Sequence, residues 1–256
     1  GVDLKQTTEV IPILLDPDLS NGDLVRTSEL LVKYQYVRSS AKPQTGFFKS
    51  KIKTLSSLNS QSETLLSSSD HFKFDLSEVS GVQFGESIGY NAMARLGDGS
   101  AKDFVDLFYN EAELESDMSI GFRGRPNIGS VVLDSFFQGS EYRDFCQTFQ
   151  SGDRIVIVSS IFGGTGAAGF PLLLRNLRAN DPSIPNSNLV AKAPIASVNL
   201  QPYFTLADSE NAEKIDSSTF LGKTKAALNY YQNTIFRANT INYFYYAGFQ
   251  SHNQYA

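Results

Sequence analysis

The fold class of this chain is decided by residues 153–171, which read Asp-Arg-Ile-Val-Ile-Val-Ser-Ser-Ile-Phe-Gly-Gly-Thr-Gly-Ala-Ala-Gly-Phe-Pro. The apolar run from Arg154 to Ser160 predicts a buried strand, and Pro171 to Asn180 predicts a helix. A strand that passes through several glycines into a helix is typical of a phosphate site. Glycine lets backbone N–H groups approach an anion, and the helix N-terminus adds about half a positive charge. A tight glycine turn without a ligand is the alternative interpretation.

Further apolar runs predict strands that alternate with helices. Ala193 to Asn199 and Ile241 to Gly248 predict two more strands, and Ser217 to Phe236 predicts a long helix between them. We expect the three strands to be parallel neighbours, because each connection is long enough for a helical crossover. Since no repeat or clean linker is found, residues 1–256 are expected to form one domain. Its predicted class is α/β, Rossmann-like, with three layers and a mostly parallel sheet.

Shorter patterns predict the remaining elements. The predicted strands are Glu9 to Asp16, which is expected to be buried, Gly46 to Lys53, His71 to Asp75 and Asp117 to Phe122. The predicted helices begin at the cap Asn21-Gly-Asp23, run from Ala101 to Glu115 with an apolar face, and pass through Val131 to Phe137 and through Phe145 to Phe149. A Ser-rich stretch, 56–69, connects two of the strands, so that residues 46–75 form an excursion from the domain.

Composition excludes several classes of protein. Of the 256 residues 41% are hydrophobic and 19% are charged, which excludes a disordered chain and allows a sizeable core. The net charge of −5, without a dense run of Lys or Arg, argues against a nucleic-acid surface. The apolar runs are too short for membrane insertion, and no signal peptide is found. The single Cys146 suits a reducing compartment, so a cytoplasmic location is expected, and one cysteine with two histidines nearly excludes a zinc site.

A dinucleotide-binding motif is matched literally by Gly164, Gly166 and Gly169, which satisfy G-x-G-x-x-G. That motif normally has an acidic residue roughly 20 positions further on, at the end of the next strand. Here the next predicted strand ends at Asn199, and no carboxylate follows until Asp208. A dinucleotide-dependent oxidoreductase is therefore the less favoured interpretation.

A longer match covers the whole of residues 153–171. They resemble the phosphate-loop signature of the tubulin/FtsZ superfamily, in which an apolar strand leads to Gly-Gly-Gly-Thr-Gly-(Ser/Thr)-Gly and a Pro follows in the next helix. The positions that match without gaps are Gly163, Gly164, Thr165, Gly166 and Pro171. Phe162 replaces the first glycine of the signature and Ala168 the last.

Three further segments resemble the same family in the right order. Gly121 to Gly129 is similar to the FtsZ loop that approaches the γ-phosphate, with Arg123 and Arg125 added. The two arginines suit anion contacts or are solvated loop charges. Val198 to Phe204 looks like the strand end that borders the ribose. Ile11 to Asp16, followed by an Asn-Gly turn, resembles the family's second strand.

The resemblance implies a divergent bacterial tubulin-like protein that binds GTP or GDP, with or without Mg²⁺. It implies a GTPase that assembles into filaments by self-association, or a non-hydrolysing scaffold of the same fold. The nucleotide-binding residues that it implies are Gly163, Gly164, Thr165, Gly166, Ala167, Arg123, Gly124, Arg125, Asn127 and Pro202. It identifies no catalytic residue. The family's first glycine-rich loop and its acidic co-catalytic loop are not found, and the chain does not begin with Met, so we expect a fragment of a longer protein.

A serine hydrolase is a further alternative. Gly85-Glu-Ser-Ile-Gly89 has the nucleophile-elbow pattern G-x-S-x-G. Ser87, then Asp208 or Asp216, then His252 would even follow the order of that triad. The preceding segment is a poor candidate for a buried strand, however, so this alternative is the least favoured.

Overall fold

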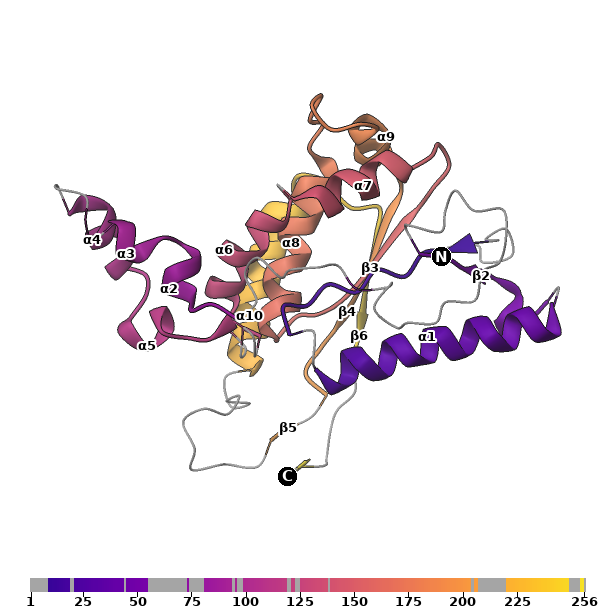
Figure 1. Cartoon of the computed structure of the whole chain (residues 1–256), viewed down its shortest axis with the longest axis horizontal. Helices are drawn as coiled ribbons and strands as arrows, with labels where there is room; N and C mark the ends of the chain where they lie inside the picture. Colours follow the sequence, from indigo (N-terminus) through magenta and orange to yellow (C-terminus); the bar gives the residue numbers. More distant parts are fainter. Residues whose placement is uncertain are drawn as a thin grey trace. The chain divides into compact units, whose positions relative to one another are not determined.

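The structure is a computed structural model, and it describes most of the chain (Figure 1). The described residues are 9–18, 21–43, 45–54, 73, 81–93, 95, 99–118, 121–122, 125–137, 139–203, 205–206, 220–248 and 254–255. Helices and short parallel sheets make it a mixed α/β structure, which confirms the predicted class at that level. The chain divides into two compact units, Gly1–Ser80 and Gly81–Ala256. A single functional domain over residues 1–256 stays a prediction.

The first unit contains one long helix and a small parallel pair of strands. Helix α1 (Gly22–Ala41) begins at the predicted cap, because the side chain of Asn21 accepts a hydrogen bond from the N–H of Asp23 at 2.9 Å. Strand β1 (Glu9–Val10) pairs with β2 (Lys51–Ile52).

Two strand predictions in this unit are wrong in extent. The strand expected over 9–16 ends at Val10, and its two residues are exposed. In the 46–53 segment the 3₁₀ helix η1 (Phe47–Lys49) precedes the two-residue β2. Residues 56–69 lie outside the described residues, as does most of 71–75, of which Lys73 forms a bridge with Leu14. In both the 9–16 and the 46–53 segments the sequence pattern predicted a strand longer than the two residues that pair with a neighbouring strand.

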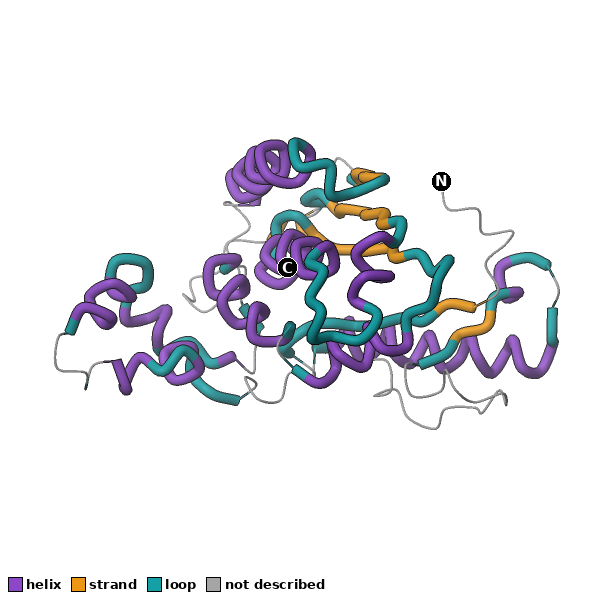
Figure 2. The backbone as a smooth tube through the Cα atoms, turned by 90° about the horizontal axis from the view of Figure 1, so that it is seen from above, coloured by secondary structure: helices purple, strands orange, loops and turns teal. Residues whose placement is uncertain are grey.

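The second unit is built on a three-stranded parallel sheet. Its strands are β3 (Ile155–Ser160), β4 (Ile195–Leu200) and β6 (Tyr243–Ala247), and they lie side by side (Figure 2). Their order in the sheet is β3-β4-β6. All pairs are parallel, with Ile157 opposite Ser197 and Ser197 opposite Phe244. The prediction of three parallel neighbours is therefore confirmed. A separate pair joins β5 (Thr205–Leu206) to β7 (Gln254–Tyr255).

Two helices cover the same face of the sheet. They are α8 (Gly164–Arg178) and α10 (Phe220–Tyr231), and α10 continues as the π-helix η6 (Gln232–Phe236). The rings of Phe170 on α8 and Tyr231 on α10 lie 5.7 and 6.1 Å from the ring of Phe244 on β6. The main core of this unit therefore lies between this face and the two helices. Side chains of the opposite face, Val156, Val158, Tyr243 and Tyr245, are exposed.

The remaining helices of this unit precede and connect the strands. They are α2 (Phe84–Ser87), α3 (Tyr90–Met93), α4 (Ser100–Asp106), α5 (Glu111–Leu114), α6 (Pro126–Phe136), α7 (Ser140–Thr148) and α9 (Ser187–Lys192). Helices α6 and α7 confirm the predictions for those segments. None of the helices in the described part of the chain is long and apolar enough to cross a membrane.

Three predictions for this unit need correction. The single helix expected over 101–115 is two helices, α4 and α5, because Asn110 starts α5 with a capping box. The Asn110 side chain accepts a hydrogen bond from the N–H of Glu113, and the Glu113 carboxylate accepts one from the N–H of Asn110. In place of the strand expected over 117–122, the described residues there contain a single bridge, from Asp117 to Gln83. The helix expected to begin at Pro171 begins at Gly164 and encloses that proline.

Candidate functional site

The predicted phosphate site lies where β3 passes into α8, at the carboxyl edge of the sheet. The N–H of Ile161 still donates to the carbonyl of Leu200 on β4, at 2.9 Å. Phe162 and Gly163 then form the turn, and the 15-residue helix α8 begins at Gly164. Carboxyl edges of parallel sheets are where α/β proteins bind ligands.

The glycines of the turn allow α8 to pack directly on the end of β3. A Cβ on Gly166 would lie 2.4 Å from the carbonyl oxygen and 2.7 Å from the backbone nitrogen of Ser160. A Cβ on Gly163 would lie 2.8 Å from the Ser160 Oγ. The space beside Gly166 is filled by the backbone of the strand. We expected this glycine to make room for a phosphate, but close packing of α8 on β3 explains why a glycine is needed there.

Backbone N–H groups at the start of α8 remain available to a ligand. Within the part of the chain that the structure describes, the N–H groups of Gly163, Gly164, Thr165 and Gly166 donate no hydrogen bond. No side chain caps the helix either. Such a helix end attracts anions, because its orphan donors carry the positive end of the helix dipole.

The starts of two further helices lie beside this turn (Figure 1). In α6, which begins at Pro126, a Cβ on Gly129 would lie 2.9 Å from the carbonyl oxygen of Gly164. The ring of Phe220, the first residue of α10, is 4.9 Å from the ring of Phe162. Three helix N-termini therefore gather at the carboxyl edge of the sheet.

In the segment 121–129, Gly129 lies against the start of α8, at Gly164. The placement of this segment opposite the phosphates, which the family resemblance implies, stays a prediction. Its described polar side chains bond to residues that precede it. The Nη1 of Arg125 donates to the Oγ of Ser116 at 2.6 Å, and the Nδ2 of Asn127 donates to the Oε1 of Glu113 at 3.2 Å. Arg123 and Gly124 lie outside the described residues. Phosphate contacts of the two arginines stay a prediction.

Pro202 also lies at this edge, two residues after the end of β4. The preceding residue, Gln201, donates its N–H to the carbonyl of Ala247 at the end of β6, at 2.8 Å. The next ring, that of Tyr203, is 6.4 Å from the ring of Phe162. Sequence reasoning missed the resulting aromatic cluster of Phe162, Tyr203 and Phe220. The one sequence signal for this cluster was Phe162, which replaces the first glycine of the tubulin/FtsZ phosphate-loop signature.

The serine-hydrolase pattern does not lie on a nucleophile elbow. Ser87 is the last residue of helix α2, and its hydroxyl donates to the carbonyl of Phe84 at 2.7 Å. In the described residues before that helix, Gln83 forms a single bridge in place of a strand. Asp208, Asp216 and His252 lie outside the described residues. The strand–turn–helix context that exposes such a serine is therefore not found around Ser87.

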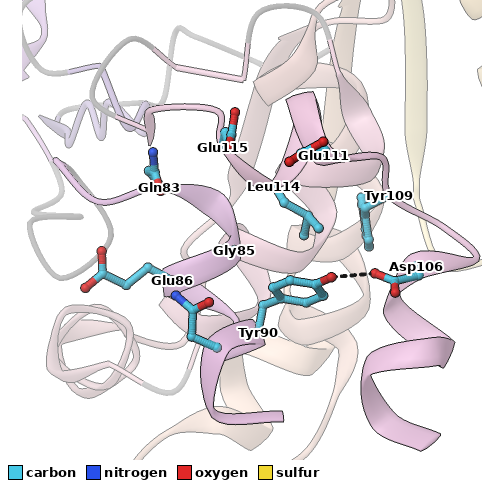
Figure 3. Close-up of a pocket in the computed structure, with 10 residues that line it drawn as sticks. Gln83, Gly85, Glu86, Tyr90, Asp106, Tyr109, Glu111, Leu114 and Glu115 are labelled. Carbon is cyan, nitrogen blue, oxygen red and sulfur yellow. Dashed lines mark hydrogen bonds between the residues drawn. The ribbon is translucent and has the colours of Figure 1, made fainter. Parts of the chain in front are cut away.

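A separate cavity of about 480 Å³ opens between α2, α3, α4 and α5 (Figure 3). It is lined by Gln83, Gly85, Glu86, Tyr90, Asn91, Asp106, Tyr109, Glu111, Leu114 and Glu115. The Asp106 carboxylate accepts hydrogen bonds from Lys102 and from the Tyr90 hydroxyl, and these bonds hold the pKa of Asp106 below its ordinary value. Carboxylates on its wall repel phosphate, so this cavity does not suit a nucleotide. Among the residues that can be described, no group of His, Cys, Asp or Glu could hold a metal ion.

Comparison of the chain with protein-family models, curated proteins and solved structures found no match. The case for a function therefore rests on the residues and geometry of the β3–α8 turn.

Proposed function

We propose that this protein binds GTP or GDP at the carboxyl edge of the β3-β4-β6 sheet, with the phosphates at the start of α8. One observation carries the proposal: the N–H groups of Gly163, Gly164, Thr165 and Gly166 have no partner among the described residues, and they open a 15-residue helix directly after a parallel strand. A negatively charged phosphate would satisfy these donors and the helix dipole together.

The proposed fold is Rossmann-like, of the tubulin/FtsZ nucleotide-binding type. Two features support it beyond the glycine pattern. The strands follow one another in parallel across the sheet. The segment 121–129, which resembles the γ-phosphate loop of that family, leads into α6 and meets the start of α8 at Gly129 and Gly164.

The chemistry that we propose at this site is binding and positioning. The four backbone donors would hold the phosphates, and Thr165 would add a hydroxyl donor. GTP hydrolysis, where it occurs, is phosphoryl transfer to water and depends on positioning and charge stabilisation. Self-association of the full-length protein would follow the tubulin pattern, and a non-hydrolysing scaffold would keep the same binding site.

Calorimetric titration of the full chain with GTP, ATP and NAD tests the proposal. We expect GTP to bind, and Thr165→Glu to weaken its binding at least tenfold, because a carboxylate in the first turn of α8 repels the phosphates. The same carboxylate favours helix formation, since it complements the dipole, so the variant is expected to fold.

Thr234→Glu is the matched control, because it adds the same charge on the exposed surface of the π-helix. It should leave GTP affinity unchanged. Absence of GTP binding by the wild-type chain, or equal weakening by the two variants, would contradict the proposed site.

A further inference from the structure

Helix α8 has a gap in its backbone hydrogen bonding directly below its first turn. The carbonyls of that turn, at residues 164–167, normally accept from the N–H groups at residues 168–171. Pro171 is the fourth of these donors and has no N–H, so the carbonyl of Ala167 lacks its partner within the helix. The first turn, which carries the proposed phosphate site, is therefore held by one ladder bond fewer than in an ordinary helix.

A hydroxyl from the neighbouring helix faces this carbonyl. Tyr231 on α10 is 1% exposed, and its hydroxyl donates to the carbonyl oxygen of Ala167 at 3.4 Å. Burial raises the pKa of Tyr231, so the hydroxyl keeps the proton that it donates. The ring is packed edge-on against Phe170 at 5.1 Å and Phe244 at 6.1 Å, which limits the positions that its hydroxyl can take.

We infer that the Tyr231 hydroxyl takes the place of the amide that Pro171 lacks and thereby positions the first turn of α8 for anion binding. Tyr231 is a positioning residue, because it acts on the ligand through Ala167. The effect of Tyr231 on nucleotide binding rests on the proposed function. Its effect on the first turn of α8 rests on the geometry of the hydrogen bond alone.

Helix α10 contacts the phosphate turn on both sides. The first residue of α10, Phe220, packs against Phe162, just before α8 begins. The last residue of α10, Tyr231, reaches the carbonyl of Ala167 at the end of the first turn of α8. The π-helix begins directly after Tyr231, at Gln232. A shift of α10 would therefore move the backbone N–H groups at residues 163–166, which are proposed to bind the phosphates.

Tyr231→Phe is the direct test, because it keeps the packed ring and removes the hydroxyl. In the full chain we expect hydrogen exchange at residues 168–170 to become about two- to tenfold faster, and GTP affinity to fall by a similar factor, which is what loss of one buried hydrogen bond produces.

Tyr142→Phe is the matched control. Tyr142 is also buried, and its hydroxyl donates to the carbonyl of Asn176 on the same helix at 3.0 Å, near the opposite end. This variant should lower stability but leave both exchange at 168–170 and GTP affinity unchanged.

Pro171→Ala provides the rescue, because alanine restores the missing N–H. In that background Tyr231→Phe should change neither readout. An unchanged exchange rate in Tyr231→Phe, or an equal effect with and without Pro171, would overturn the inference. Failure of the wild-type chain to bind GTP would overturn the proposed function instead, while the exchange experiment would still decide the role of Tyr231.

Discussion

Helices α8 and α4 carry similar apolar patterns but differ in what covers them. On α8, Phe170, Leu174 and Leu177 are each 1% exposed, because the helix packs on the sheet and on α6. On α4 and the turn after it, Phe104, Leu107 and Phe108 are 62, 79 and 60% exposed. Helical spacing therefore identifies an apolar face, but only a neighbouring element decides whether that face becomes core.

The difference has an energetic consequence. Burial of a large apolar side chain is the main favourable term in folding, so α8 should carry much of the stability of its unit and α4 little. Substitutions of the same kind in the two regions can test this.

The largest difference is expected between Phe170→Ala and Phe104→Ala. Removal of the buried Phe170 ring should lower the free energy of unfolding by about 3–5 kcal/mol. Loss of the exposed Phe104 ring should change it by about 0.5 kcal/mol or less. Urea denaturation of both variants measures the contrast, and an equal loss would mean that the α4 face is covered in solution.

A smaller contrast is expected between two glycines that are each the third residue of their helix. Gly166→Ala places a methyl group 2.4 Å from the backbone oxygen of Ser160 and should cost about 1–3 kcal/mol through overpacking. Gly222→Ala, on α10, meets no atom within 4 Å and should stabilise the protein by up to about 1 kcal/mol. Thermal unfolding distinguishes them. Equal stability of the two variants would show that α8 does not pack on the end of β3.

The smallest effect concerns the exposed Asp106 near the acidic cavity. Its pKa is lowered chiefly by the hydrogen bond from Lys102 and next by that from Tyr90. Lys102→Met should therefore raise the Asp106 pKa toward the ordinary value near 3.8, and Tyr90→Phe should raise it less. NMR titration of the carboxyl carbon measures both shifts.

The sign of the pH effect follows from that lowered pKa. A carboxyl group whose pKa is lower in the folded state stabilises the protein above its unfolded pKa, and this contribution is lost as the pH falls through the folded pKa. Wild type and Lys102→Met should therefore differ above about pH 4 and converge in stronger acid. An Asp106 pKa that is the same in both proteins would contradict the hydrogen bonds seen here.

The parallel strands and the helices that connect them could be predicted, because each is a continuous apolar run or a periodic face between clear turn residues. The residues at which the helices begin and end were harder to predict. Pro171 predicted a helix start, yet α8 begins seven residues earlier, at Gly164. Glycine disfavours a helix by itself, but α8 packs so closely on Ser160 that the space beside Gly166 has no room for a Cβ. Asn110, in turn, divides a segment whose apolar spacing predicted one helix.

The sequence by itself determined the parallel α/β class and the place of the candidate site, because both depend on local patterns: the β3 run, the glycines after it and the helix that follows. Only the tertiary structure decided which backbone donors lack a partner among the described residues and what fills the space beside Gly166. It also decided how Tyr231 reaches the carbonyl that Pro171 leaves without a partner in the helix. Tyr231 and Ala167 are far apart in sequence, and their contact exists only because the sheet places α8 and α10 side by side on one face.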